Sequence, residues 1–184
     1  MDNDIKQIKI EEPIKNYKTK TKTILCQKER KMRVETQFWG LNDEELSHNK
    51  QLNILTDSHF IQNENKNTYI SKLLSHIKHK ISGYRHQDIL KKKFNDGEFV
   101  SFEETVNLLK LSNLKCCYCS ENIYILYEHV REMKQCSLDR IDNNMGHNMG
   151  NLVVACLECN LKRRRTNKDA FMFTKNMVII KEGQ

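Results

Sequence analysis

Four cysteines in two C-x-x-C pairs are the residues of this chain whose spacing most clearly implies chemistry. Cys116 and Cys119 form one pair, and Cys156 and Cys159 form the other. A C-x-x-C turn directs two thiolates into one small volume, and two turns supply the tetrahedral sulfur set that a structural Zn²⁺ prefers. The alternatives are two accidental pairs or a redox dithiol, which would need a βαβ setting that the sequence does not indicate. The spacing therefore predicts a zinc site.

The other three cysteines have no partner at ligand spacing. Cys117 lies inside the first turn and should point away, although it could replace a neighbour, while Cys26 and Cys136 should be ordinary thiols. The N-terminus alternates charged and polar residues without the apolar region of a signal peptide, and no run is long enough to span a membrane. We therefore expect an intracellular protein that is neither secreted nor membrane-bound, in which thiols stay reduced and available to metals.

The segment between the cysteine pairs has the pattern of a β-hairpin. The apolar stretches from Cys136 to Ile141 and from Asn151 to Ala155 flank a loop rich in Asn and Gly. This loop is long enough to be functional as well as connective. The basic residues 160–165 follow the second cysteine pair and predict a helix that begins there.

The segment from about Lys115 to Phe173, roughly a third of the chain, resembles the HNH endonucleases, the zinc-knuckle branch of the ββα-metal nucleases. It is most similar to a variant group of phages and large DNA viruses in which Asp-Arg-Ile-Asp replaces the usual Asp-His-Ile. The matching residues are the two cysteine pairs, Leu138-Asp139-Arg140-Ile141-Asp142, Gly146-His147, Asn151-Leu152-Val153 and Asn160.

The resemblance implies a metal-dependent DNA endonuclease that leaves a 5′ phosphate and a 3′ hydroxyl. It makes Asp139 the carboxylate ligand of a catalytic Mg²⁺ or Mn²⁺ and Asn151 the side-chain carbonyl ligand of the same ion. Both offer the oxygen that a hard divalent cation prefers. Asn160 matches the last residue of the motif, and we expect it to orient the loop and not to bind the ion.

Arg140 departs from the usual motif, which has the catalytic base histidine at this position. Arginine stays charged and cannot accept a proton, but it can donate a fork of hydrogen bonds to a phosphate. His147 is the replacement base that we expect, because an imidazole titrates near neutral pH; alternatively it caps the loop. Asp142 could be a second ligand or could orient Arg140. The missing histidine is the evidence for an alternative, a non-catalytic zinc-ribbon protein that binds nucleic acid.

The charge of the chain favours a polyanionic partner. It has 31 Lys and Arg against 24 Asp and Glu, a net charge of +7, although such a surface can also serve solubility alone. Lys162, Arg163, Arg164 and Arg165 form a basic run that could be a solvated helix face. Its place after a metal site favours contact with the backbone of DNA, or alternatively of RNA.

The rest of the chain predicts an α+β protein, in which a small helical N-terminal part precedes the zinc-stapled module. Residues 1–65 should be a basic, flexible arm, 66–114 a helical subdomain, 115–175 the HNH module and 176–184 a tail. Apolar residues from Ile70 to Ile81 have helical spacing with a stop at Gly83, and a second helix should follow over 86–94. Ser101 and Glu104 form a capping box for a third helix. The histidines of this part should be solvated.

Overall fold

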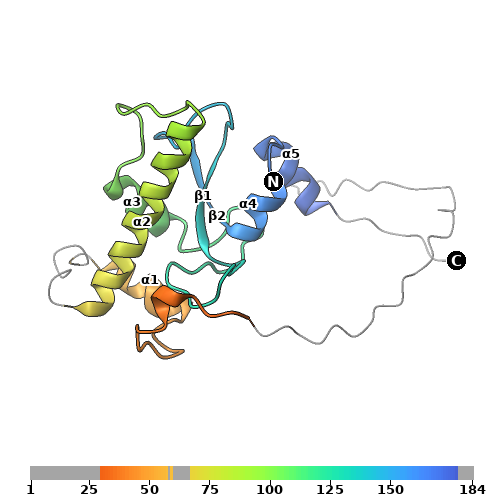
Figure 1. Ribbon diagram of the computed structural model, residues 1–184. Coiled ribbons are helices and arrows are strands. Elements are labelled where there is room, and N and C mark those ends of the chain that lie inside the picture. Colours follow the sequence, from red (N-terminus) through yellow and green to blue (C-terminus); the bar gives the residue numbers. More distant parts are fainter. Residues whose placement is uncertain (1–29, 58, 60–66, 178–184) are drawn as a thin grey trace, which may run out of the picture.

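The structure is a computed structural model that describes residues 30–57, 59 and 67–177. Helices and one small antiparallel sheet make up the described part, which confirms the predicted α+β class (Figure 1). Residues 1–29, with Cys26, and most of the predicted tail lie outside the described residues. The elements are η1 (Val34–Thr36), α1 (His48–Thr56), α2 (Thr68–Leu90), α3 (Phe102–Leu111), β1 (Cys136–Arg140), β2 (Leu152–Cys156), α4 (Leu157–Arg163) and α5 (Lys168–Asn176).

The two strands form the hairpin that the sequence predicts. β1 pairs antiparallel with β2, and the register runs from Cys136 opposite Cys156 to Arg140 opposite Leu152. Ser137 and Asp139 lie on one face of β1, because side chains alternate along a strand. α4 begins directly after β2, and Figure 1 shows it beside the hairpin, across from α2. The hairpin therefore separates a long helix from a short one.

A single long helix, α2, replaces the two helices that the sequence predicts. It runs through Gly83 to Leu90, whereas the sequence predicts a stop at Gly83 and a second helix over 86–94. A glycine costs a helix interior only about 1 kcal/mol relative to alanine, which tertiary contacts can offset. Those contacts come from Tyr84 and Asp88, which lie one turn apart on the side facing the hairpin. The capping box of Ser101 and Glu104 is confirmed at the start of α3.

One hydrophobic core joins the helical part to the hairpin. Side chains of α2 and α3 are buried together with the segment before β1 and with both strands. A buried side chain of this size contributes about 1.5–3 kcal/mol, so the two parts stabilise each other. The predicted boundary near residue 114 therefore crosses a continuous core, whose members include Leu73, Leu74, Ile77, Val106, Leu109, Ile123, Ile125, Leu138 and Val154.

Residues 30–57 are folded onto this core, although the sequence predicts an arm over residues 1–65. α1 buries Leu55 completely, and the buried amide of Gln51 accepts hydrogen bonds from the backbone N–H groups of Ile125 and Leu126 at 2.8 and 2.9 Å. The chain before η1 pairs with the segment before β1, since Arg33 N–H donates to the carbonyl of Glu128. Long-range hydrogen bonds hold this segment, and local periodicity does not reveal them.

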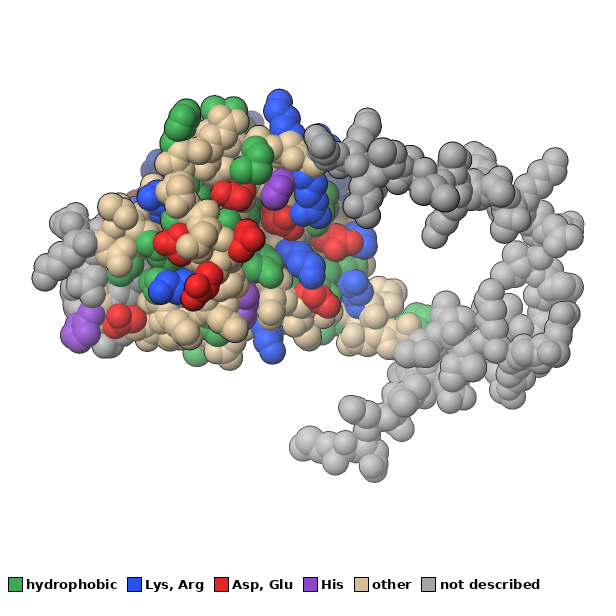
Figure 2. Space-filling model, turned by 90° about the horizontal axis from the view of Figure 1, so that it is seen from below, with side chains coloured by type: hydrophobic (Ala, Val, Ile, Leu, Met, Phe, Trp, Pro, Cys, Tyr) green, Lys and Arg blue, Asp and Glu red, His purple; other side chains and the backbone are tan. Residues whose placement is uncertain are grey.

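The described surface carries both signs of charge. Figure 2 shows blue Lys and Arg side chains scattered among red acidic and green hydrophobic ones on the face seen from below. The net charge of +7 is therefore not spread as a uniform basic face on this side. None of the helices in the described ranges is long and apolar enough to cross a membrane.

Candidate metal centre and catalytic cavity

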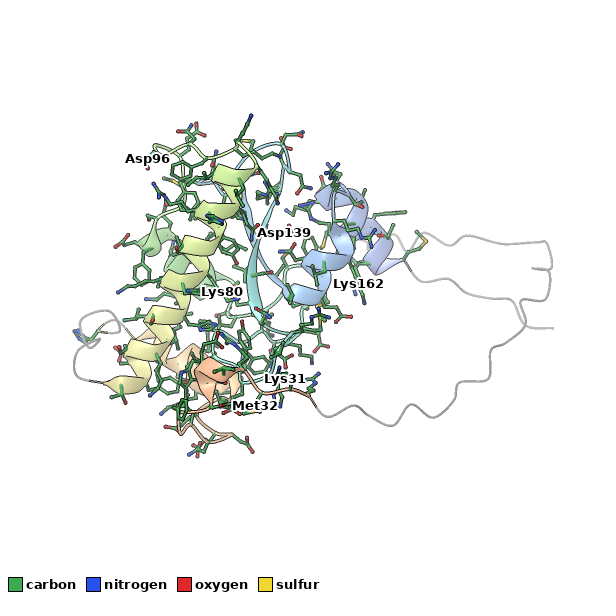
Figure 3. The ribbon with its side chains drawn as sticks, in the orientation of Figure 1. Lys31, Met32, Lys80, Asp96, Asp139 and Lys162 are labelled. Carbon is green, nitrogen blue, oxygen red and sulfur yellow. The ribbon has the colours of Figure 1, made fainter. Side chains whose placement is uncertain are left out.

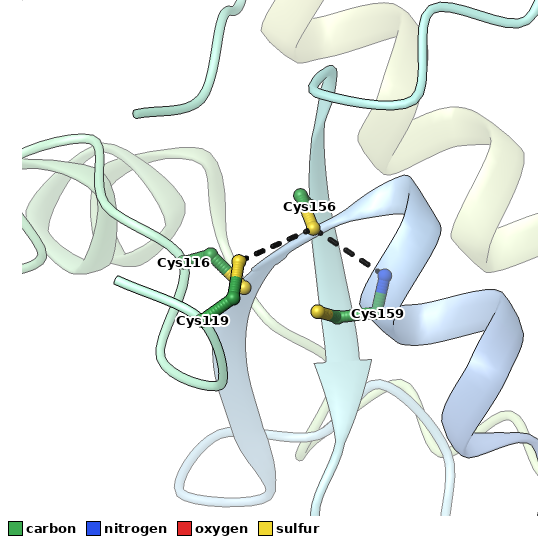
Figure 4. A group of neighbouring side chains, drawn as sticks. All are labelled: Cys116, Cys119, Cys156 and Cys159. Carbon is green, nitrogen blue, oxygen red and sulfur yellow. Dashed lines mark hydrogen bonds between the residues drawn. The ribbon is translucent and has the colours of Figure 1, made fainter. Parts of the chain in front are cut away.

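The four cysteines of the two C-x-x-C pairs converge on one point (Figure 4). Their sulfur atoms all lie within 4.8 Å of one another, and Sγ of Cys119 is 3.9 Å from Sγ of Cys156. A tetrahedral zinc ion with bonds of about 2.3 Å would separate its sulfur ligands by about 3.8 Å. The described residues therefore offer a four-thiolate set of the size and chemistry that suit Zn²⁺.

Local hydrogen bonds explain why the cysteines meet. Cys116 and Cys119 lie on the turn after α3, and Cys117 N–H ties this turn to β2 by donating to Val154 O at 2.9 Å. Cys156 is the N-cap of α4, so its sulfur accepts from Cys159 N–H at 3.3 Å. A hydrogen bond with Cys156 lowers the pKa of Cys116, which favours one thiolate before an ion binds. Cys117 stays outside the cluster.

A cavity of about 510 Å³ lies between α2, β1 and α4. Of the residues that the sequence singles out, Asp139, Arg140, His147, Asn160 and Arg164 line it, and Asn151 and Asp142 do not. Figure 3 shows Asp139 on β1 between the two helices, with Lys80 on the α2 side. Four cations, two oxygen donors and two imidazoles therefore share one hollow, because His79 and Lys80 of α2 and Lys91 at its C-cap also line it.

The carboxylate of Asp139, in the cavity wall, accepts three hydrogen bonds from two side chains. Its Oδ2 atom accepts from the Tyr118 hydroxyl at 2.8 Å and from Arg163 Nε at 2.6 Å. Its Oδ1 atom accepts from Arg163 Nη2 at a longer 3.3 Å. Burial and the neighbouring carboxylate raise the pKa of Tyr118, so this phenol remains a donor. Oδ1 is the carboxylate oxygen with more freedom to bind a ligand.

The resemblance implies that Asn151 binds the ion and that Asn160 orients the loop. In the structure Asn160 lines the cavity, and Asn151 does not. The carbonyl oxygen of Asn151 accepts from Asp142 N–H at 2.8 Å, and its amide donates to Asp142 O and Gly146 O, both at 3.0 Å. Asn151 therefore braces the loop from within. Asn160 lines the cavity, and its amide donates to Ser137 Oγ at 3.2 Å.

His147 is held by a buried carboxylate that the sequence did not single out. Its Nδ1 atom lies 2.9 Å from Oδ1 and 3.0 Å from Oδ2 of Asp88, and its backbone N–H donates to Oδ2 at 2.6 Å. The ring stacks on Tyr84 of α2, with centroids 4.5 Å apart. Since Asp88 occupies Nδ1, Nε2 is the nitrogen left to accept a proton. Burial lowers the pKa of His147, and Asp88 offsets this only in part, so the ring is neutral at pH 7.

The loop that carries His147 is clamped by the segment after α2. Val100 N–H donates to His147 O at 3.0 Å, and Asn148 Nδ2 donates to Glu98 at 2.8 Å. At Gly146, a Cβ atom would lie 2.5 Å from Lys93 O and 2.9 Å from Asp88 Oδ2. A side chain at position 146 would therefore push the loop away from α2.

The side chains of the basic run Lys162–Arg165 do not share one exposed surface. Arg163 is fully buried, and its guanidinium binds Asp139 and the carbonyls of Thr166 and Arg140. Lys162 pairs with Glu158 at 2.5 Å on the exposed side of α4. Arg164 lines the cavity, and Arg165 is exposed. Arg163 is thus a structural residue, and the predicted contact with a nucleic-acid backbone is limited to its neighbours.

Tyr84 and Asp88 of α2, and Lys91 at its C-cap, contribute to the site although no signal in the sequence marked them. They belong to a segment whose pattern is that of an ordinary amphipathic helix. A helix that continues past Gly83 would have placed Tyr84 and Asp88 on the same face as Ile77 and Ile81, since residues three and four apart are neighbours. That extension is the one sequence feature that could have pointed to them.

Comparisons with known proteins returned no relative: no family model, no curated protein and no solved structure matches this chain. The geometry of the described residues is therefore the basis for assigning a function.

Proposed function

We propose that this chain is a metal-dependent DNA endonuclease whose active site is the cavity beside β1. One observation carries the proposal: Asp139, Asn160 and His147 line the same cavity, with Lys80, Lys91, Arg140 and Arg164 around them. Two oxygen donors suit a hard divalent cation, and the imidazole suits a general base. The surrounding cations suit a phosphodiester, which carries a negative charge at each linkage.

Each side chain has a role that its surroundings allow. Nε2 of His147 takes a proton from the attacking water, because Asp88 holds Nδ1 and burial keeps the ring neutral. Arg140 and Arg164 donate hydrogen bonds to phosphate oxygens and offset the charge that builds as the water attacks. Mg²⁺ or Mn²⁺ held by Asp139 and Asn160 would polarise the phosphate and stabilise the leaving 3′ oxygen. The four cysteines would hold a separate zinc ion that stabilises the module.

A second candidate is a non-catalytic zinc protein that binds nucleic acid. The observation in its favour is the ion pair of Asp139 with Arg163, in which Oδ2 of Asp139 lies 2.6 Å from Nε. A carboxylate already neutralised by arginine binds a cation more weakly. The cavity would then hold a phosphate through its cations without hydrolysing it.

A plasmid assay separates the two candidates. Supercoiled DNA is incubated with the wild type and with Asn160→Ala, Asp139→Asn and His147→Ala, with added Mg²⁺ or Mn²⁺ and without. The endonuclease predicts nicking that needs the added ion and that the Asn160 and Asp139 variants lose. His147→Ala should lose about 10² to 10⁴ in rate, the usual contribution of a general base.

Circular dichroism and thermal melting of each variant distinguish lost chemistry from lost folding. DNA binding by a folded wild type that never nicks would establish the binding protein instead. Asn151→Ala serves as a comparison, since we expect it to act through the loop and to lower stability as well as rate. If His147→Ala is as active as the wild type, His147 is not the general base and another group takes the proton.

A further inference from the structure

We infer that the backbone of a DNA strand continues from the catalytic cavity along α2 into a groove beside Arg33 and Trp39. The inference rests on the proposed function and extends it, because it names a second binding surface far from the reacting groups. We call this surface the α2 groove. It consists of two hollows of about 400 and 330 Å³, and the argument uses their residues Lys31, Arg33, Trp39, Lys72, His79 and Arg131.

The α2 groove is continuous with the catalytic cavity. His79 lines both the cavity and the hollow of about 400 Å³, and Gln135 lines both the cavity and the hollow of about 330 Å³. Arg33 lines both hollows, so the three spaces share walls. In Figure 3 Lys80 lies by α2, and Lys31 lies further down the molecule, below the hairpin. A strand that leaves the active site in this direction meets the groove next.

The charge of the groove suits a polyanion. Lys31, Arg33, Lys72 and Arg131 line its two hollows, where Glu35 is the single carboxylate among the lining residues and lies 3.6 Å from Nε of Arg33. Three of the four cations therefore have no carboxylate beside them in the hollows. Arg33 is held in place, since its guanidinium carbon lies 4.6 Å from the ring centre of Tyr127 and Nη1 donates to Tyr127 O at 3.3 Å. A cation fixed by its neighbours loses less conformational entropy when it binds a phosphate.

Lys80 links the cavity to the groove. Its ammonium donates to Gln135 Oε1 at 2.9 Å and lies 5.5 Å from the ring centre of Tyr127. Tyr127 thus contacts both Lys80 and Arg33, and its hydroxyl donates to Gln135 at 2.7 Å. Tyr127 and Gln135 therefore connect Lys80 of the cavity with Arg33 of the groove.

The length of α2 sets the reach of the groove. Lys72 and Tyr84 are separated by roughly 18 Å along the helix axis, at about 1.5 Å per residue. One strand of duplex DNA advances about 3.4 Å per nucleotide, so this length corresponds to about five nucleotides. We therefore expect the protein to grip DNA over about five nucleotides on one side of the scissile phosphate.

Trp39 provides a direct test, because it is the single tryptophan of the chain and lines the groove. The full-length protein with its zinc, and without added Mg²⁺ so that the DNA stays intact, is titrated with a fluorescein-labelled duplex of about 16 base pairs. Anisotropy of the label reports binding, and Trp39 emission reports the groove. We expect both signals to change with the same midpoint.

A charge variant supplies the second measurement. Lys31→Ala/Lys72→Ala removes two groove cations, and Lys50→Ala on the exposed side of α1 is the matched control. The slope of log affinity against log salt should fall by up to about 1.8 in the double variant, at about 0.9 per phosphate contact, and should stay unchanged in the control.

The outcomes distinguish this inference from the proposed function. Binding seen by anisotropy with constant Trp39 emission, or with an unaltered salt slope in the double variant, overturns the α2 groove and leaves the nuclease proposal standing. A wild type that neither binds nor cleaves DNA overturns both.

Discussion

Nδ1 of His147 lies 2.9 Å from Oδ1 of Asp88, although the two residues are 59 positions apart in the sequence. Asp88 is fully buried, and it also accepts from the backbone N–H of His147. The contact joins α2 to the loop between the strands, so the helical part of the chain orients the proposed base. A module that began at the first cysteine pair would lack this carboxylate.

Replacing Asp88 by Asn should change the pH profile of cleavage as well as its rate. Burial lowers the pKa of His147, while Asp88 raises it and Arg140 and Lys91 lower it further. A neutral ring is needed to accept a proton, so the rate should rise with pH through this pKa and level off above it. Without the carboxylate the pKa falls again, and the rising limb moves to lower pH. The plateau rate should fall about 10- to 100-fold, as for other groups that orient a functional histidine.

Initial rates of plasmid nicking between pH 4.5 and 8 test this prediction, with circular dichroism at each pH to follow folding. A purely structural role for Asp88 would lower the rate equally at every pH. An unmoved rising limb in Asp88→Asn would therefore contradict the orienting role. His86→Gln, at an exposed position of the same helix, controls for the loss of a charged or titrating group nearby.

Zinc should stabilise the fold through the four clustered cysteines alone. Cys159→Ser removes one of the converging sulfurs, whereas Cys117→Ser changes a neighbouring thiol outside the cluster. Because the energy of binding a structural ion is also folding energy, Cys159→Ser or a strong chelator should lower the Tm by about 10 °C or more. This corresponds to several kcal/mol at about 2–4 °C per kcal/mol for a chain of this size.

Zinc content by atomic absorption and thermal melting check both variants. Cys117→Ser should keep one zinc ion per chain and the Tm of the wild type. Full zinc content in Cys159→Ser, or loss of zinc in Cys117→Ser, would show that a different set of thiols holds the ion.

Replacing each of the two neighbouring arginines at the end of α4 by Met should affect a different property: protein stability for Arg163 and DNA binding for Arg164. Arg163→Met leaves the buried carboxylate of Asp139 without its ion pair, which lies at 2.6 Å, and should cost about 3–5 kcal/mol of unfolding free energy. Arg164→Met alters an exposed side chain of the cavity and should change stability by less than about 0.5 kcal/mol. It should instead weaken DNA binding and lower the salt slope by about 0.9.

Urea unfolding and anisotropy titrations on the two proteins measure these effects side by side. Equal stability losses would mean that Arg164 also has a structural role. If Arg163→Met is fully stable but binds DNA more weakly, Arg163 contacts DNA together with the other residues of the basic run.

The sequence revealed those parts of the molecule whose signal is local. The two cysteine pairs, the apolar stretches on either side of an Asn- and Gly-rich loop, and the capping box of Ser101 and Glu104 are each confined to a few residues. The structure confirms the hairpin and the box, and it brings the four cysteines together. The α+β class follows from these elements.

Contacts between distant segments were not predictable in the same way. Asp88 in its sequence context resembles any surface carboxylate, and only the fold buries it against His147. The run Lys162–Arg165 looks uniform, but a helix turns 100° per residue, so α4 directs Arg163 alone into the core. The amides of Asn151 and Asn160 likewise took their roles from hydrogen bonds to the loop and to Ser137.

The buried imidazole of His76 should make the protein less stable in acid. The sequence predicts a solvated histidine, yet this side chain is 8% exposed and lies edge-on to Trp39 and Tyr127. Burial, with smaller effects of Lys80, Arg33 and His79, lowers its pKa from 6.5 to about 3. The unfolded chain therefore binds a proton between pH 6.5 and 3 that the folded chain does not. Stability is full above pH 6.5 and falls as the pH drops through this window, by up to about 1.4 kcal/mol per pH unit.

His76→Phe keeps an aromatic ring between Trp39 and Tyr127 and removes the titration. Between pH 6 and 5 the wild type should lose about 1 kcal/mol more unfolding free energy than the variant, as measured by urea denaturation with zinc content checked at both pH values. Protonation of the cysteine thiols affects both proteins alike and cancels in the difference. Identical losses in the two proteins would mean that His76 gains solvent or an acceptor in solution and is not held neutral by burial.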